Sequence, residues 1–241
     1  MRLLVVFEGD IPNNLPGAGG ATTAVPLQGE AYERFHRYFG HLEEARGLKV
    51  IVDRSGKTPR LVASAFSYTF DLVRFSYKIF AIEAARSELT PGEAFAWIDA
   101  DVLCLKPFSA ADLEPFMPGP DQIMSYLGRS RDPPNAPYSE CGFLGFNPRH
   151  PQLDAFLDRM TAIYASGEAF SFQEWHDSWL WDAVRKEFEA TGAAFKNISG
   201  VHEAHHHPFI NCGLGTYFDH LKGPDRKKAG RSAAYDYVAG Q

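Results

Sequence analysis

Short apolar runs alternate with helical patterns along the first hundred residues. Residues 2–7 (RLLVVF), 48–52 (LKVIV) and 94–98 (AFAWI) are apolar runs that end at an acidic residue, which is typical of buried strands. Residues 30–46 and 70–86 instead repeat their apolar side chains with the period of a helix. The alternation of strand, helix and strand predicts an α/β domain.

Two more strands and two more helices are predicted in the second half of the chain. They cover residues 123–127, 142–146, 152–165 and 175–190. Glycine and proline punctuate residues 9–29, and the tail from Gly223 mixes glycine and serine with basic residues, so both segments are predicted to be loops. No persuasive linker divides the chain, and a single domain over residues 1–241 is expected.

The composition is that of a globular protein. Of the 241 residues, 45% are hydrophobic and 14% aromatic, which is enough for a full core. The net charge of −6 disfavours nucleic acid as a partner, so an anion site would need locally placed cations or a metal. The first apolar run is too short for a secretion signal or a membrane span, which predicts a cytoplasmic protein and leaves a peripheral membrane contact open.

Neither the cysteines nor the histidines indicate a zinc site. Cys104, Cys141 and Cys212 are odd in number and contain no CxxC pair, which fits a reducing compartment without a disulfide framework. His202 and residues 205–207 form a histidine-rich tract. Consecutive histidines do not easily converge on one tetrahedral ion, so a dedicated zinc site is not expected.

An acidic pair follows the third predicted strand directly. Asp99 and Asp101 stand one residue apart at the carboxyl end of AFAWI, where open α/β sheets bind ligands. Carboxylates in this arrangement point the same way, and they suit Mg²⁺ or Mn²⁺ shared with a diphosphate. A strand also ends in solvated aspartates by chance. A second alternative is the haloacid-dehalogenase pattern, in which Asp99 would be a nucleophile, although that family carries its motif on the first strand.

Four motifs, taken in order, resemble the GT-A glycosyltransferases, particularly family 8, which includes glycogenin and bacterial lipopolysaccharide hexosyltransferases. They are FSYKIFA at residues 75–81 ahead of FAWIDADVL at 95–103, ECGFLGFN at 140–147, HDSWL at 176–180, and HLKG at 220–223 followed by Arg226, Lys227 and Lys228. The resemblance spans about residues 71–228. It implies a single Rossmann-like domain with a mostly parallel mixed sheet flanked by helices, nucleotide-binding mainly over 1–106 and acceptor-binding mainly over 107–241.

The resemblance also implies a metal site and a donor site. Asp101 and His220 would bind Mn²⁺ or Mg²⁺, with Asp99 contacting the metal, its water or the ribose of the donor. Gly223 and Lys227 would hold the diphosphate of the donor. The spacing from Gly223 to Lys227 is one residue longer than in the family, unless Arg226 takes the lysine's place. The implied reaction moves a hexose from a UDP-sugar to a hydroxyl of a glycan or glycoconjugate, with retention, as in polysaccharide biosynthesis.

Two carboxylates are candidates for the catalytic step. Glu140 stands where the family usually has Asn, and Asp177 precedes Ser178, which stands where the family has Gln. Either carboxylate would position or deprotonate the acceptor hydroxyl. The alternatives are an ordinary edge carboxylate for Glu140 and a helix-start residue for Asp177. An inverting mechanism would use one of the same carboxylates, and the sequence does not separate the two cases.

Further donor contacts are expected from two other segments. Arg74 and Lys78 lie four residues apart on one predicted helix and could reach one anion together, or form a solvated face. Phe7 and Glu8 are expected near the base or ribose. Trp175 is the candidate for stacking on an acceptor sugar.

Two other readings of the whole chain stay open at this point. One is a nucleotidyltransferase, although the glycines of residues 17–20 lack neighbouring cations. The other is a non-catalytic module that binds a nucleotide-sugar. For a transferase, the segment 223–232 is expected to close over the diphosphate and exclude water.

Overall fold

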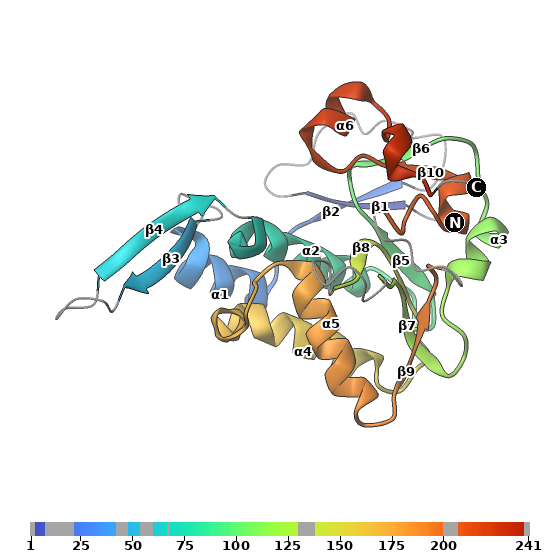
Figure 1. The fold of residues 1–241 in the computed structure, drawn as a ribbon. Helices are drawn as coiled ribbons and strands as arrows, with labels where there is room; N and C mark the ends of the chain where they lie inside the picture. The colour runs from blue at the N-terminus through green and yellow to red at the C-terminus, as the bar shows by residue number, and fades with distance from the viewer. Residues whose placement is uncertain are drawn as a thin grey trace. The chain divides into compact units, whose positions relative to one another are not determined.

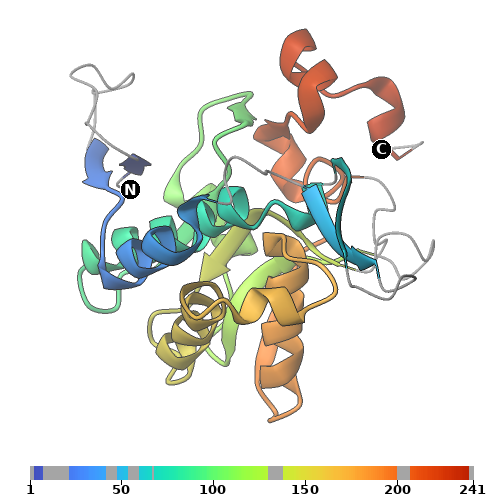
Figure 2. The same cartoon turned by 90° about the vertical axis from the view of Figure 1, so that its left-hand side faces the viewer.

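The computed structural model describes residues 3–7, 22–41, 48–53, 60–66, 68–129, 138–199 and 207–238. The chain forms two compact units, each assembled from separate stretches (Figures 1 and 2). The sheet unit comprises Thr90–Phe156 and Trp181–Gln241, and the helix unit comprises Arg2–Leu89 and Leu157–Leu180. The expected division of one domain at residues 106 and 107 stays a prediction.

The sheet unit is built on four strands in the order β5-β8-β7-β9 (Figure 1). They are β5 (Phe95–Ile98), β7 (Gln122–Leu127), β8 (Glu140–Phe146) and β9 (Ala194–Asn197). β8 pairs antiparallel with β5 and with β7, whereas β9 runs parallel to β7. The α/β class is confirmed, but the expected mostly parallel sheet is wrong for this unit. An apolar run identifies a buried strand without giving its direction, which only the pairing partner sets.

A short antiparallel pair beside this sheet carries the chain into the candidate site. β6 (Val102–Cys104) pairs with β10 (Phe218–His220), and the register places His220 opposite Val102. The segment after β5 and the end of β10 are therefore neighbours, although they are far apart in sequence. Neither strand was predicted, because a three-residue strand is too short to show a period of two.

The tail after Gly223 contains a helix where a loop was predicted. α6 (Gly223–Ala229) has a proline in its first turn, ends at Gly230 in the left-handed conformation, and carries its basic residues in the last turn. All three features favour a helix of this length. Gly223 itself has a φ of 80°, a conformation that favours glycine at the entry to α6. The shorter α3 (Ala110–Leu113) begins with a capping box at Ser109.

The core of the sheet unit lies along β8, whose seven residues are all buried. The Trp181 ring packs within 6.0 Å of Phe146 and 5.6 Å of Phe156, measured between ring centroids. Trp181 belongs to α5 (Asp177–Glu189) and Phe156 to α4 (Leu153–Ala165), the two helices that were predicted in this half of the chain. The strands at 123–127 and 142–146 are also confirmed.

The helix unit contains the first strands and helices of the chain. They are β1 (Leu3–Phe7), β2 (Thr22–Pro26), α1 (Glu30–Phe39), β3 (Leu48–Asp53), β4 (Arg60–Phe66) and α2 (Leu72–Ser87). α1 and α2 lie side by side in Figures 1 and 2, with the rings of Phe35 and Phe80 5.5 Å apart. Aromatic packing of this kind buries large apolar areas and holds the two helices together.

Most of the predicted elements of the helix unit are confirmed, with two corrections. Residues 22–26 were predicted as loop, yet they form β2, which pairs parallel with β1. The helix predicted over 30–46 ends at Phe39, because Gly40 interrupts a good helical pattern. None of the helices in the described ranges combines the length and hydropathy needed to span a membrane.

Candidate functional site

The acidic pair lies on a turn between two strands of the sheet unit. The backbone N–H of Asp99 donates to the carbonyl of Gly142 on β8, and the N–H of Val102 donates back to the carbonyl of Asp99. The N–H of Leu221 donates to the carbonyl of Asp101, which ties this turn to the end of β10. The carboxylates thus stand at the end of a strand on a turn held from both sides.

His220 brings a nitrogen ligand to the acidic pair. Its Nε2 lies 3.2 Å from Asp101 Oδ1 and 3.7 Å from Asp99 Oδ2. One ligand atom from each of the three residues lies within 4.8 Å of the others, a spacing that can hold a metal ion. The three metal ligands implied by the family resemblance are therefore gathered at one place, and metal binding itself stays a prediction.

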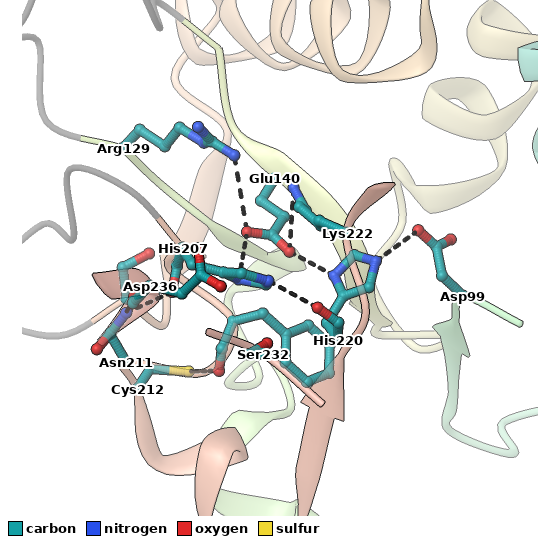
Figure 3. Close-up of polar contacts among 12 residues, drawn as sticks. Asp99, Arg129, Glu140, His207, Asn211, Cys212, His220, Lys222, Ser232 and Asp236 are labelled. Atoms are coloured by element: carbon teal, nitrogen blue, oxygen red, sulfur yellow. Dashed lines mark hydrogen bonds and ion pairs between the residues drawn. The ribbon is translucent and has the colours of Figure 1, made fainter. Parts of the chain in front are cut away.

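The other nitrogen of the His220 ring contacts Glu140 (Figure 3). His220 Nδ1 lies 2.6 Å from Glu140 Oε1, and the Glu140 side chain is only 1% exposed. Burial alone would raise the pKa of this carboxyl, but Lys222, His207 and His220 lower it well below its usual value. Glu140 is therefore an ionised carboxylate inside the protein, placed behind the imidazole and away from the acidic pair.

Gly142 makes room for this imidazole. A methyl group added at residue 142 would stand 2.6 Å from both Cε1 and Nδ1 of His220 and 3.1 Å from Cδ2 of Phe209. Those distances are far below ordinary contact, so a side chain here would displace the ring. The glycine of the ECGF motif thus has a packing role in the site.

Glu140 also faces a second histidine that the sequence did not single out as a ligand. His207 Nε2 lies 2.8 Å from the carbonyl oxygen of His220 and donates to it, which leaves His207 Nδ1 facing Glu140 Oε2 at 3.5 Å. Among the described residues, neither of these two atoms has a hydrogen-bond partner. Arg129, another residue without a predicted role, approaches Glu140 Oε2 at 3.8 Å. His207 belongs to the histidine-rich tract, which was not expected to bind a metal, and no motif in the sequence pointed to Arg129.

The set Glu140, His207 and His220 also has the spacing of a metal site, but its charges oppose a cation. One carboxylate there is already approached by Lys222 at 3.3 Å and by Arg129. A divalent ion would add two positive charges to a closed pocket that holds a single negative one. The outer set has two carboxylates, and the side chains of Asp99 and Asp101 are 22% and 30% exposed, so it keeps room for a substrate oxygen.

Of the cations predicted to hold a diphosphate, Lys227 faces the acidic pair. Lys227 Nζ lies 2.8 Å from Asp101 Oδ2, whereas the Arg226 guanidinium makes two hydrogen bonds of 3.0 and 2.6 Å to Asp236 and lies over the Tyr235 ring. The sequence left open which of the two residues takes the position of the family's lysine. The structure places Lys227 beside the acidic pair, and a role in holding a diphosphate stays a prediction.

Asp101 and His220 each shift the pKa of the other toward the charged form. Burial alone would raise the pKa of Asp101, but hydrogen bonds from His220 and Lys227 lower it well below its usual value. Burial alone would lower the pKa of His220, but hydrogen bonds to Asp101 and Glu140 raise it. The site is therefore a focus of negative charge ringed by cations, which suits a ligand that brings both a metal ion and an anion.

Comparisons of the chain with protein-family models, with curated proteins and with solved structures found no match. The resemblance to family 8 glycosyltransferases therefore rests on the short sequence motifs and stays a prediction.

The other predicted donor and sugar contacts belong to the helix unit. Lys78 Nζ lies 2.5 Å from Asp177 Oδ2, and Asp177 begins α5, where its Oδ1 accepts the N–H of Ser178. Arg74 is exposed, with its guanidinium 5.7 Å from the Phe75 ring. Lys78 is thus already paired with Asp177, and joint binding of an anion by Arg74 and Lys78 stays a prediction.

The structure tests three remaining predictions only in part. Phe7 is the last residue of β1, and Glu8 lies outside the described residues, as do His202, His205 and His206. The Trp175 ring packs against Phe70 and Phe170, and its indole N–H donates to the carbonyl of Phe172. Trp175 therefore belongs to an aromatic cluster of the helix unit, and a contact with an acceptor sugar stays a prediction.

Replacing Lys78 by Met is expected to lower the free energy of unfolding by about 3 kcal/mol, because Asp177 would be left buried and uncompensated. Denaturant unfolding measures this change. In the double variant with Asp177→Asn, the loss should be smaller than the sum of the single losses by about 1–3 kcal/mol. The pKa of Asp177 lies below its usual value, so its contribution is complete above about pH 4 and is lost as the pH falls further.

The control for this cycle is Arg74→Met on the same helix. That exposed side chain should change stability by no more than about 0.5 kcal/mol. Additive losses from Lys78→Met and Asp177→Asn would show that the two side chains are not coupled.

Proposed function

We propose that the protein is a metal-dependent glycosyltransferase, which moves a hexose from a nucleoside diphosphate sugar to a hydroxyl of a glycan or glycoconjugate acceptor. One observation carries this proposal: two carboxylates on a strand-end turn, Asp99 and Asp101, meet the imidazole Nε2 of His220, with Lys227 beside them. The order of the four motifs along the chain supports the same function.

The residues present fit Mg²⁺ or Mn²⁺. Carboxylate oxygens suit both ions, and a neutral imidazole completes the set, while the partial exposure of both aspartates leaves positions for phosphate oxygens. When bound, such an ion supplies Lewis-acid stabilisation of the departing diphosphate. Asp99, Asp101 and His220 would hold the ion, and Asp101 would release Lys227 toward a phosphate oxygen of the donor.

The donor side of the site includes the entry to α6. Gly223, with its φ of 80°, turns the chain so that α6 starts next to His220 and Lys222. The ammonium group of Lys227 then comes from the second turn of this helix. We infer that α6, rather than the flexible loop expected from the sequence, presents the cation that holds the diphosphate.

Of the two carboxylates expected to act in the catalytic step, Glu140 is the less accessible to an acceptor. Glu140 is buried behind the His220 ring, and an acceptor hydroxyl in the open part of the site would have to pass that ring to reach it. Asp177 remains the sequence-based candidate for contacting the transferred sugar or the acceptor. Retention of configuration, a UDP donor and a place in polysaccharide biosynthesis follow from the family resemblance alone and belong to this proposal. The cytoplasmic location also belongs to it, and follows from the short first apolar run and the cysteines.

Release of nucleoside diphosphate from a panel of UDP-, GDP- and TDP-sugars, with Mn²⁺ or with EDTA, tests the proposal. Metal-dependent release from one donor is the expected result, and the product formed with an added glycan then names the acceptor. Hydrolysis of a simple phosphate ester that requires Asp99, without release from any donor, would instead establish a phosphatase of the haloacid-dehalogenase type, the alternative in which Asp99 is a nucleophile. Metal and UDP binding without any turnover, tested with a range of acceptors, would establish the binding module.

Replacing Lys227 by Met is expected to lower kcat/KM for the donor by roughly 10- to 100-fold. The variant loses a charge-assisted hydrogen bond to a phosphate oxygen, which is worth about 1.5–3 kcal/mol. Initial rates at varied donor concentration measure the change. The matched control is Lys228→Met, an exposed neighbour on the same helix, which should keep kcat/KM within about twofold. Equal losses in both variants would point to a general effect of positive charge on α6.

A further inference from the structure

His220 stands between two carboxylates, and only one of its ring nitrogens can bind a metal at the acidic pair. Nε2 faces Asp101 at 3.2 Å, and Nδ1 faces Glu140 Oε1 at 2.6 Å. The nitrogen that carries the proton in a neutral imidazole is set by the hydrogen bond that it makes. A carboxylate only accepts, so the short contact with Glu140 keeps a proton on Nδ1, and Nε2 is the nitrogen that gives up its proton when a metal binds at the acidic pair.

We propose that Glu140 is a positioning residue, which fixes the tautomer and the ring orientation of His220 so that Nε2 is presented to a metal held with Asp99 and Asp101. The inference rests on the proposed function, because Glu140 would support His220, one of the three metal ligands of that function. Metal-binding histidines usually donate their second N–H to a carboxylate or a carbonyl, and loss of that partner weakens metal binding.

The residue type at position 140 is part of this inference. An amide there could donate its NH₂ group to Nδ1 as readily as it could accept from it, and donation would move the ring proton to Nε2. Nε2 would then hold the only proton of the neutral ring and would have no lone pair for a metal. Glutamate excludes this second arrangement.

The surroundings of Glu140 keep the carboxylate in place (Figure 3). Lys222 Nζ approaches Oε1 at 3.3 Å, and Arg129 approaches Oε2 at 3.8 Å, so the buried charge is compensated from two sides. His207 donates to the carbonyl oxygen of His220 at 2.8 Å and thereby holds the backbone from which the imidazole projects. Gly142 leaves the space that the ring fills. Lys222 and Arg129 thus hold Glu140, and His207 and Gly142 hold His220. None of these four residues belongs to the outer metal set.

Glu140→Gln tests this role. It keeps the shape of the side chain but replaces a carboxylate, which only accepts hydrogen bonds, by an amide, which can also donate them. We expect Mn²⁺ affinity, measured by electron paramagnetic resonance of the free ion, to fall roughly 10- to 100-fold. Cooperative unfolding should be retained. The control is Asp121→Asn, which removes one exposed negative charge from the same unit and should leave Mn²⁺ affinity unchanged. Unchanged affinity in Glu140→Gln would overturn the proposal.

Turnover of the donor separates a positioning role from a role as general base. For a positioning residue, the rate of Glu140→Gln at low Mn²⁺ should be depressed and should return to near that of the unaltered protein at saturating Mn²⁺. A general base would instead lower kcat at saturating Mn²⁺ with the metal affinity unaltered. That second outcome would overturn the positioning role and assign Glu140 to the chemical step.

Ring-nitrogen signals of His220 keep this inference separate from the proposed function. ¹⁵N spectra of the metal-free protein, assigned with His220→Ala, should show a proton on Nδ1 whose signal changes in Glu140→Gln. If the Nδ1 signal depends on Glu140 in a protein that binds no Mn²⁺, then Glu140 controls the His220 ring, and the proposed metal-dependent transferase is excluded. If the His220 signals are the same in both proteins, the positioning role is overturned whatever the metal does.

Discussion

Asp101→Asn is expected to lower metal-dependent turnover of the donor by about a thousandfold. Asp101 is the carboxylate closest to His220 Nε2, at 3.2 Å, and its second oxygen lies 2.8 Å from Lys227. An amide at position 101 removes one negative charge from the proposed metal ligands. It also removes the ion pair that positions Lys227, the cation expected to reach the diphosphate. Losing several kcal/mol of stabilisation of the departing diphosphate corresponds to a rate loss of this size.

The same variant should fold normally, because the Asp101 side chain is partly exposed and its contacts lie at the surface of the unit. Nucleoside diphosphate release with and without Mn²⁺ measures the rate, and thermal unfolding measures the fold. Asp121→Asn, an exposed residue of the same unit, serves as the matched control and should retain full turnover. Turnover of Asp101→Asn within tenfold of the unaltered protein, at limiting Mn²⁺, would remove Asp101 from the metal set.

Gly142→Ala is expected to abolish tight metal binding and to destabilise the sheet unit by about 1–3 kcal/mol. The added methyl group would stand 2.6 Å from two atoms of the His220 ring, which is buried and cannot retreat without breaking its contact with Glu140. The displaced ring would carry Nε2 away from Asp101. A change of one carbon atom, on a residue that binds nothing, should thus remove a ligand from the site.

Mn²⁺ affinity and denaturant unfolding together test this prediction. The control is Gly119→Ala, where the added methyl group would meet only the flexible end of the Gln122 side chain at 3.2 Å. That variant should keep both its metal affinity and, within about 1 kcal/mol, its stability. If Gly142→Ala is destabilised but binds Mn²⁺ normally, then the position of the His220 ring does not govern the metal site.

The sequence predicted the longer elements of the fold well. The strands around residues 3–7, 95–98 and 122–127 and the helix at 72–87 were recognised, because several turns or alternations of apolar residues make a local signal. β4, β6, β9 and β10 were not predicted, and β2 and α6 were predicted as loops. β2 follows a stretch rich in glycine and proline, and α6 is short and polar, so neither shows the apolar period on which the prediction depends.

The sequence also predicted the members of the metal set, from motif order rather than from periodicity. Asp99, Asp101 and His220 were named together, and the structure brings them within reach of one ion. The role first given to Glu140 illustrates the limit of such motifs. Its position in the chain indicated a carboxylate near the sugar pocket, whereas the structure places it behind the imidazole of His220.

By itself, the sequence determined where most of the longer strands and helices form and which residue types could bind a metal and a diphosphate, because these depend on neighbours within a few positions of the chain. The tertiary structure decided the antiparallel direction of the main sheet, the pairing of β6 with β10 and the contacts of Arg129 and His207 with Glu140. These features join segments that are distant in the chain. Their energies come from pairing and packing between those segments, which no local pattern of polar and apolar residues records.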